Sequence, residues 1–158
     1  MPEPAFNGIC RCQCGEVEIL VKKPPITRLN CHCPVCQEVY GKAFSDMTLA
    51  WNSSFVLEDV SKIQFKKQRS FPIAVQCGTC KSCKQPVAGL STLLSLFKIS
   101  LIPSYMYPHQ AELPESAGHI FYQSRVCDVQ DTLPKYQTFV SSQLAVARFV
   151  ISALSTSR

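Results

Sequence analysis

Short segments of alternating polar and apolar residues recur along most of the chain and predict a mainly β protein. Residues 15–21 alternate and are followed by Pro24 and Pro25, a pattern typical of a half-buried strand that ends in a turn. Further short strands are predicted at 43–51, 55–57, 63–66, 74–76 and 118–122. The apolar stretch 87–102 contains serine, threonine and glycine and precedes Pro103, so it favours one or two buried strands over a helix.

Two segments have helical character. Residues 35–40 can form one turn of helix, and residues 141–155 predict a C-terminal helix that begins with two capping serines. The second helix should carry apolar residues near one face, namely Leu144, Phe149, Val150, Ile151 and Leu154. We expect this face to pack on the domain or on a second subunit, which makes a homodimer possible. A membrane-surface role is disfavoured because the body of the helix has one basic residue.

Nine of the ten cysteines fall into three tight clusters. The clusters are Cys10-Arg11-Cys12-Gln13-Cys14, Cys31-His32-Cys33-Pro34-Val35-Cys36 and Cys77-Gly78-Thr79-Cys80-Lys81-Ser82-Cys83. A short turn or strand with this spacing can aim two thiolates at one metal ion, whereas a disulfide between such close neighbours would be strained. Sets of thiolates select zinc, Cu(I) or iron–sulfur clusters, and zinc is the natural first choice.

Two of the clusters contain cysteine pairs that suit one closed metal site. Cys12 and Cys14 are spaced like two side chains on the same face of a strand, and Cys80 and Cys83 are spaced like a metal-binding knuckle. Together they would supply four thiolates, the ligand set of a structural zinc. Cys10 and Cys77 are additional cysteines, and either one could shift the ligand set by one position.

The remaining cluster offers Cys31, Cys33 and Cys36, three thiolates with no obvious fourth ligand. An incomplete ligand set is typical of catalytic zinc, which keeps one position for water or substrate. The alternative is a second structural zinc completed by Cys77 or Cys10. The ring of His32 should point away from the metal because alternate side chains of an extended segment face opposite sides.

Three further residues bear on the metal chemistry. His109 lies among prolines and should be exposed, whereas His119 begins a predicted strand and should be structural. Cys127 stands alone in the sequence, so we expect a free buried thiol there.

Size and composition predict a single domain over residues 1–158. Hydrophobic residues make up 46% of the chain and charged residues 17%, which is enough to build a core. The first six residues have neither a basic region nor an apolar region of the kind found in signal peptides, so we expect a cytoplasmic protein with reduced cysteines. No stretch predicts a membrane span.

The net charge of +5 is weak evidence for a nucleic-acid partner. Seven thiolates and two zinc ions would together add three negative charges and so offset most of the excess. The chain also has no basic tail and no strip of aromatic and basic residues for stacking on bases. We therefore expect two zinc ions per chain and no nucleic acid.

The three cysteine clusters, in this order, resemble the glutathione-dependent formaldehyde-activating enzyme family, which also includes centromere protein V. The family pattern is Cys-x-Cys-Gly, then Cys-His-Cys-x-x-Cys, then Cys-x-x-Cys-Gly-x-Pro followed by Leu or Val. It appears here as Cys12-Gln13-Cys14-Gly15, as Cys31-His32-Cys33-Pro34-Val35-Cys36, and as Cys80-Lys81-Ser82-Cys83-Lys84-Gln85-Pro86-Val87. Segments 41–55, 119–121 and 131–134 are similar as well, so the resemblance covers residues 7–138.

The resemblance implies a fold of small antiparallel sheets around zinc, called a β-tent. It implies a structural zinc on Cys12, Cys14, Cys80 and Cys83. It also implies a catalytic zinc on Cys31, Cys33 and Cys36. The implied activity joins glutathione and formaldehyde to give S-(hydroxymethyl)glutathione, and the reverse reaction is that of a carbon–sulfur lyase. The centromere-protein relatives suggest an alternative, a non-catalytic zinc module that binds a protein or nucleic acid.

This chain departs from the family pattern in several places. Lys84 stands where the family usually has glycine, and Cys10 and Cys77 are extra. No tryptophan follows Arg125, and the C-terminal helix lies outside the pattern. The exact thiol and aldehyde are therefore not fixed by the resemblance.

Overall fold

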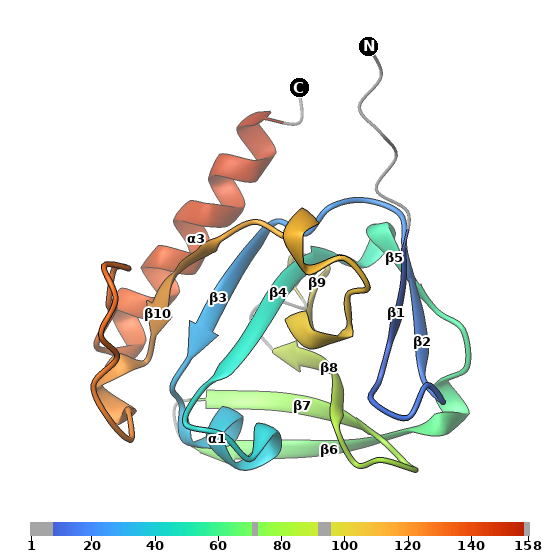
Figure 1. Ribbon diagram of the computed structural model, residues 1–158. Helices are drawn as coiled ribbons and strands as arrows, with labels where there is room; N and C mark the ends of the chain where they lie inside the picture. Colours follow the sequence, from blue (N-terminus) through green and yellow to red (C-terminus); the bar gives the residue numbers. More distant parts are fainter. Residues whose placement is uncertain (1–7, 71–72, 92–95, 157–158) are drawn as a thin grey trace.

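The computed structural model describes residues 8–70, 73–91 and 96–156, which form two β-sheets and a long C-terminal helix (Figure 1). The smaller sheet has the order β1-β2-β5 and is antiparallel. Its strands are β1 (Gly8–Arg11), β2 (Glu18–Val21) and β5 (Phe55–Leu57). The loop between β1 and β2 carries Cys12 and Cys14.

The larger sheet has seven strands in the order β10-β3-β4-β9-β8-β7-β6. These are β3 (Thr27–Cys31), β4 (Ser45–Trp51), β6 (Ile63–Ser70), β7 (Ile73–Cys80), β8 (Pro86–Ser91), β9 (Ile99–Pro103) and β10 (Ser116–Ile120). All neighbours are antiparallel except β10 and β3, which run parallel. This parallel pair brings His119 and Ile120 opposite Asn30 and Cys31.

Within residues 8–70, 73–91 and 96–156, the α-helices with described bounds are α1 (Pro34–Tyr40) and α3 (Phe139–Thr156). Single 3-10 turns are η1 (Asn52–Ser54), η2 (Val60–Lys62), η3 (Ser104–Met106), η4 (Gln110–Glu112) and η5 (Tyr122–Ser124). Helix α1 begins at Pro34, which suits the first turn because proline has no N–H to satisfy. It ends at Gly41 with φ of 60°, a left-handed conformation that glycine adopts without steric cost.

The buried apolar residues form two clusters, and each contains one group of cysteines. The first cluster includes Cys12 and Cys80, together with Val17, Ile19 and Val87. The second includes Cys31, Cys33, Leu29, Ile120 and Val146. Each cysteine group is therefore partly buried in apolar surroundings, although Cys14 of the first group is exposed.

Helix α3 packs on the domain through one face only. Val146 and Val150 are buried against the second core cluster, and the buried Ser142 accepts a hydrogen bond from the N–H of Phe121 at 2.8 Å. The opposite face leaves four apolar side chains more than half exposed: Val140, Leu144, Ile151 and Leu154. Contrary to the expectation from sequence, Phe139–Thr156 is long and apolar enough to cross a membrane by length and composition alone, with 22% of the segment buried in the domain.

The mainly β architecture with a C-terminal helix is confirmed, and several predicted details change. Strand 55–57 is found as predicted, the 87–102 stretch contains two strands, and the helix over 35–40 has seven residues. Strands β1 and β3 were not predicted. The single apolar face expected on the C-terminal helix is wrong, because Val150 points inward whereas Leu144 and Ile151 point to solvent.

Candidate metal centres

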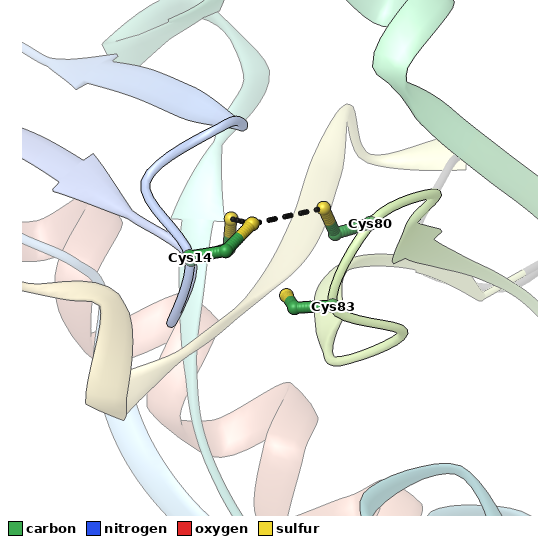
Figure 2. Close-up of side chains that lie close together, drawn as sticks. Cys14, Cys80 and Cys83 are labelled. Carbon is green, nitrogen blue, oxygen red and sulfur yellow. Dashed lines mark hydrogen bonds between the residues drawn. The ribbon is translucent and has the colours of Figure 1, made fainter.

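Four cysteines from distant parts of the chain meet at one point. The sulfurs of Cys12, Cys14, Cys80 and Cys83 all lie within 4.8 Å of one another. Cys14 Sγ is 3.5 Å from Cys12 Sγ and 3.7 Å from Cys80 Sγ. Figure 2 shows the sulfurs of Cys14, Cys80 and Cys83 facing one another across the gap between two loops.

These distances fit a tetrahedral metal ion. Zinc–sulfur bonds of about 2.3 Å place the sulfurs of a tetrahedron about 3.8 Å apart. A disulfide needs about 2.05 Å, and all ten cysteines are free thiols in the structure. The residues present therefore fit a thiolate-bound zinc at this position.

Local backbone turns orient the side chains of these four cysteines. In the first loop Gly15 has φ of 81°, its N–H bonds to the carbonyl of Cys12, and the N–H of Val17 donates to Cys12 Sγ at 3.3 Å. In the second loop the N–H of Lys84 donates to the carbonyl of Cys80. Burial acts to raise the pKa of Cys83, but N–H groups of Gln85 and Cys14 outweigh it and lower that pKa to about 7.

The second group consists of Cys31, Cys33 and Cys36, whose sulfurs also lie within 4.8 Å of one another. Cys31 ends β3, Cys33 caps the N-terminus of α1, and Cys36 lies in the first turn of that helix. The N–H of Cys36 donates to Cys33 Sγ at 3.4 Å. Among the described residues, no fourth histidine, cysteine or carboxylate joins this group.

The three thiols differ in the direction in which their pKa values are shifted. Hydrogen bonding to Cys31 and then Cys36 lowers the pKa of Cys33 well below the ordinary thiol value. Hydrogen bonding to Cys33 and Cys36, together with burial, raises the pKa of Cys31. The Cys36 pKa is also raised, because Cys33 and burial outweigh the opposite effect of Cys31. The group thus stabilises one thiolate by itself, and a bound cation would favour loss of the other two protons.

Cys10 and Cys77 lie outside both groups. Cys77 and Cys80 are three residues apart on the same strand and therefore face opposite sides of it. Accordingly Cys80 belongs to the first core cluster, whereas Cys77 packs against the second. Cys10 is fully buried, and burial raises its pKa to about 12. The expectation of a buried Cys127 is wrong, because this thiol is exposed in the loop after η5.

A cleft of about 460 Å³ is lined in part by the end of α1, the helix that carries Cys36, although none of the three cysteines lines it. Its lining residues are Tyr40, Lys42, Ala43, Phe44, Asp46, Tyr105 and Gln110. Tyr40 lies one helical turn after Cys36, and Asp46 follows Ser45, which pairs with Cys31 across β3 and β4. Burial, followed by the charge on Cys36, raises the pKa of Tyr40. No sequence pattern predicted this cleft, since its residues come from separate segments.

Comparison with models of known protein families shows which family the chain belongs to. The model of the glutathione-dependent formaldehyde-activating enzyme family matches residues 7–124, which is most of the chain. The chain belongs to this family. No curated protein sequence matches the chain. The family is one of enzymes that act on glutathione and formaldehyde, which supports a thiol partner, and both cysteine groups fall within the matched segment.

A buried pair of histidines lies behind the three-cysteine group of this family member. His32 is 1% exposed, and its Nε2 lies 2.8 Å from Nδ1 of the fully buried His119. Nε2 of His119 lies 2.8 Å from a carboxylate oxygen of Asp131. Burial and the neighbouring His119 lower the pKa of His32 to about 4. His32 is therefore buried against His119 and is not one of the converging ligands, as expected, and His109 is exposed as expected.

Lys84, which stands where the family usually has glycine, adopts a left-handed backbone conformation. Its φ is 64°, and Gly15 in the opposing loop has φ of 81°. Glycine adopts such angles without a clash, whereas a residue with a Cβ is strained. The structure thus supplies a physical reason for glycine at this position.

Replacing Lys84 by glycine should stabilise the protein by up to about 1 kcal/mol. Relief of the left-handed strain exceeds the extra chain entropy that glycine gives the unfolded state. Urea unfolding of the zinc-loaded protein measures the change. Lys81→Gly in the same turn is the control and should be neutral or destabilising, because Lys81 does not have positive φ. Equal effects of the two variants would contradict this explanation.

Proposed function

We propose that the protein is a zinc-dependent enzyme of the carbon–sulfur lyase type that joins glutathione, or another small thiol, to formaldehyde or a similar small aldehyde. One observation carries this proposal. Three cysteines converge without a fourth ligand among the described residues, and a cleft is lined by Tyr40 of α1, the helix that carries Cys36. A fourth protein ligand at this three-cysteine group would instead favour a non-catalytic zinc module. The matched family supports the choice of thiol and aldehyde.

The proposed reaction forms one carbon–sulfur bond. The thiol sulfur attacks the carbonyl carbon of the aldehyde, the carbon–oxygen π bond breaks, and the thiol proton ends on the oxygen. The reverse reaction releases the thiol and the aldehyde. Zinc held by Cys31, Cys33 and Cys36 would supply a Lewis acid that makes a thiol ligand ionise near neutral pH.

The residues around the cleft have separate roles in this proposal. Cys31, Cys33 and Cys36 hold the metal, and the apolar core behind them excludes water from one side. The cleft has a volume within the range of about 300–1,000 Å³ that is usual for small-molecule sites. Lys42 offers a positive charge to a glutathione carboxylate, while the carboxylate of Asp46 is held by Arg28 at 2.7 and 2.9 Å.

The cofactor part of the proposal is two zinc ions per chain. We assign a structural zinc to Cys12, Cys14, Cys80 and Cys83, because four sulfurs from two loops converge at distances that suit a tetrahedral ion. Reduced thiols are required at both centres, which fits a cytoplasmic location. The homodimer expected through the C-terminal helix stays a prediction, and the exposed apolar face of α3 is the surface it would use.

Cobalt substitution tests whether the three-cysteine centre accepts a thiol. Millimolar glutathione should change the thiolate-to-cobalt charge-transfer band of the cobalt-loaded protein, because a new sulfur ligand enters the open position. The change should be absent in Cys33→Ser and present in Cys77→Ser, which removes a nearby cysteine outside the group. An unchanged spectrum of the wild-type protein would contradict the proposal.

A further inference from the structure

Three side chains form a continuous hydrogen-bonded chain from the surface to His32, the residue between two cysteines of the three-cysteine centre. Asp131, whose side chain is 29% exposed, contacts His119, and His119 contacts His32. His32 lies between Cys31 and Cys33 in the sequence. Residues 32 and 119 are 87 positions apart, and the parallel pairing of β10 with β3 brings them together.

The carboxylate determines the direction of these hydrogen bonds. Oδ1 of Asp131 accepts from Lys135 Nζ at 2.7 Å and from the N–H of Leu133 at 3.1 Å. Hydrogen bonds from Lys135 and then His119 lower the pKa of Asp131 to about 2, so it is ionised and only accepts. His119 must then donate from Nε2. A neutral His119 accepts at Nδ1, and His32 must donate from its own Nε2.

The remaining nitrogen of His32 supports the same direction. Its Nδ1 is buried and has no hydrogen-bond partner among the described residues. If His32 donates from Nε2 to His119, its Nδ1 carries only a lone pair and needs no acceptor. In the opposite direction it would carry a proton, and a buried N–H without an acceptor is both costly and rare.

We propose that Asp131 is a positioning residue: it acts through His119 to fix the tautomer and ring orientation of His32, and so holds the sulfurs of Cys31 and Cys33 toward the metal. The inference rests on the proposed metal at this centre. The ring of His32 is anchored on one side of an extended segment, so the flanking cysteines are held on the other side. The N–H of His32 also donates to the carbonyl of Ile120 at 3.0 Å, which ties the segment to β10.

The effect should be confined to one centre. The closed group lies in the first core cluster, and the backbone hydrogen bonds of its loops join residues within 12–17 and 80–85 and link Lys81 to Lys62. None of Asp131, His119 and His32 belongs to that cluster. A change at Asp131 should therefore weaken the three-cysteine centre and leave the four-cysteine centre unaffected.

Nitrogen NMR of the zinc-loaded wild-type protein tests the direction of the chain without any variant. Long-range ¹H–¹⁵N spectra distinguish protonated from unprotonated ring nitrogens. We expect His32 and His119 both to carry their proton on Nε2. A proton on Nδ1 of His32, or two protons on His119, would overturn the proposal.

Asp131→Asn tests the consequence for the metal. Lys135 and Leu133 both donate to Oδ1, so the asparagine should place its oxygen there and turn its NH2 group toward His119. This reverses the direction of the chain and moves the His32 proton to Nδ1, where no acceptor is described. Zinc affinity of the three-cysteine centre should fall by roughly tenfold, the lower end of effects seen for groups behind metal ligands.

The two centres are compared in one competition titration with a chelator, using cobalt absorption to separate them. Asp128→Asn is the matched control, because it removes the same charge three residues away, where Asp128 contacts the exposed Arg125. Loss of affinity at the three-cysteine centre alone, in Asp131→Asn alone, supports the proposal. Equal weakening of both centres, no weakening, or the same effect in Asp128→Asn would overturn it. None of these measurements needs turnover, so a failure of the proposed activity would be seen separately.

Discussion

Cys80→Ser should unfold the protein under conditions in which the wild type is folded. Cys80 is fully buried in the first core cluster and supplies one of the four sulfurs that join the β1–β2 loop to the turn after β7. A structural zinc contributes about 10–16 kcal/mol to folding in small zinc domains, which is as large as the whole stability of an ordinary domain. We expect a loss on the order of 5 kcal/mol or more.

Thermal unfolding followed by circular dichroism measures this loss, and elemental analysis of the same samples measures zinc. The wild type should hold two zinc ions per chain. Cys10→Ser is the matched control, because Cys10 lies in the same core cluster but outside the four-sulfur group. It should keep both zinc ions and lose about 1–3 kcal/mol through its buried hydroxyl. Unfolding to the same extent in both variants would argue against a structural metal.

Cys33→Ser should abolish catalysis while the fold is retained. Cys33 is the most readily ionised thiol of the three-cysteine group and also caps α1, a role that serine can take over. Zinc content should fall from two per chain to one. We expect kcat/KM for addition of glutathione to formaldehyde to fall by at least about 100-fold, because metal activation contributes several kcal/mol.

The assay must follow formation of the hemithioacetal above its spontaneous rate, since thiols add to formaldehyde unaided. Cys77→Ser is the control: Cys77 packs against the same core cluster but is not one of the three converging cysteines. It should keep its activity and both zinc ions. Full activity in Cys33→Ser, or unfolding as severe as that of Cys80→Ser, would make the second centre structural.

The sequence by itself determined the local chemistry of this protein. Two-residue and three-residue spacings of Cys12, Cys14, Cys80 and Cys83 predicted which thiols share a turn, because such spacings depend only on backbone geometry over a few residues. Alternating polar and apolar positions predicted most strands and the C-terminal helix for the same reason. Strands β1 and β3 were not predicted, because each overlaps a cysteine cluster that was interpreted as a metal-binding segment.

Only the tertiary structure decided between the alternatives that spacing left open. The sequence alone could not decide whether Cys77 or Cys80 is a ligand of the four-cysteine group. In the structure they lie three residues apart on β7 and so face different core clusters. The chain from Asp131 to His32 depends on a parallel pairing between strands far apart in sequence. Long-range pairing is set by the packing of the whole core, and no local pattern encodes it. The same is true of α3, where burial divided one apolar helix into a face that packs on the domain and a face that is exposed.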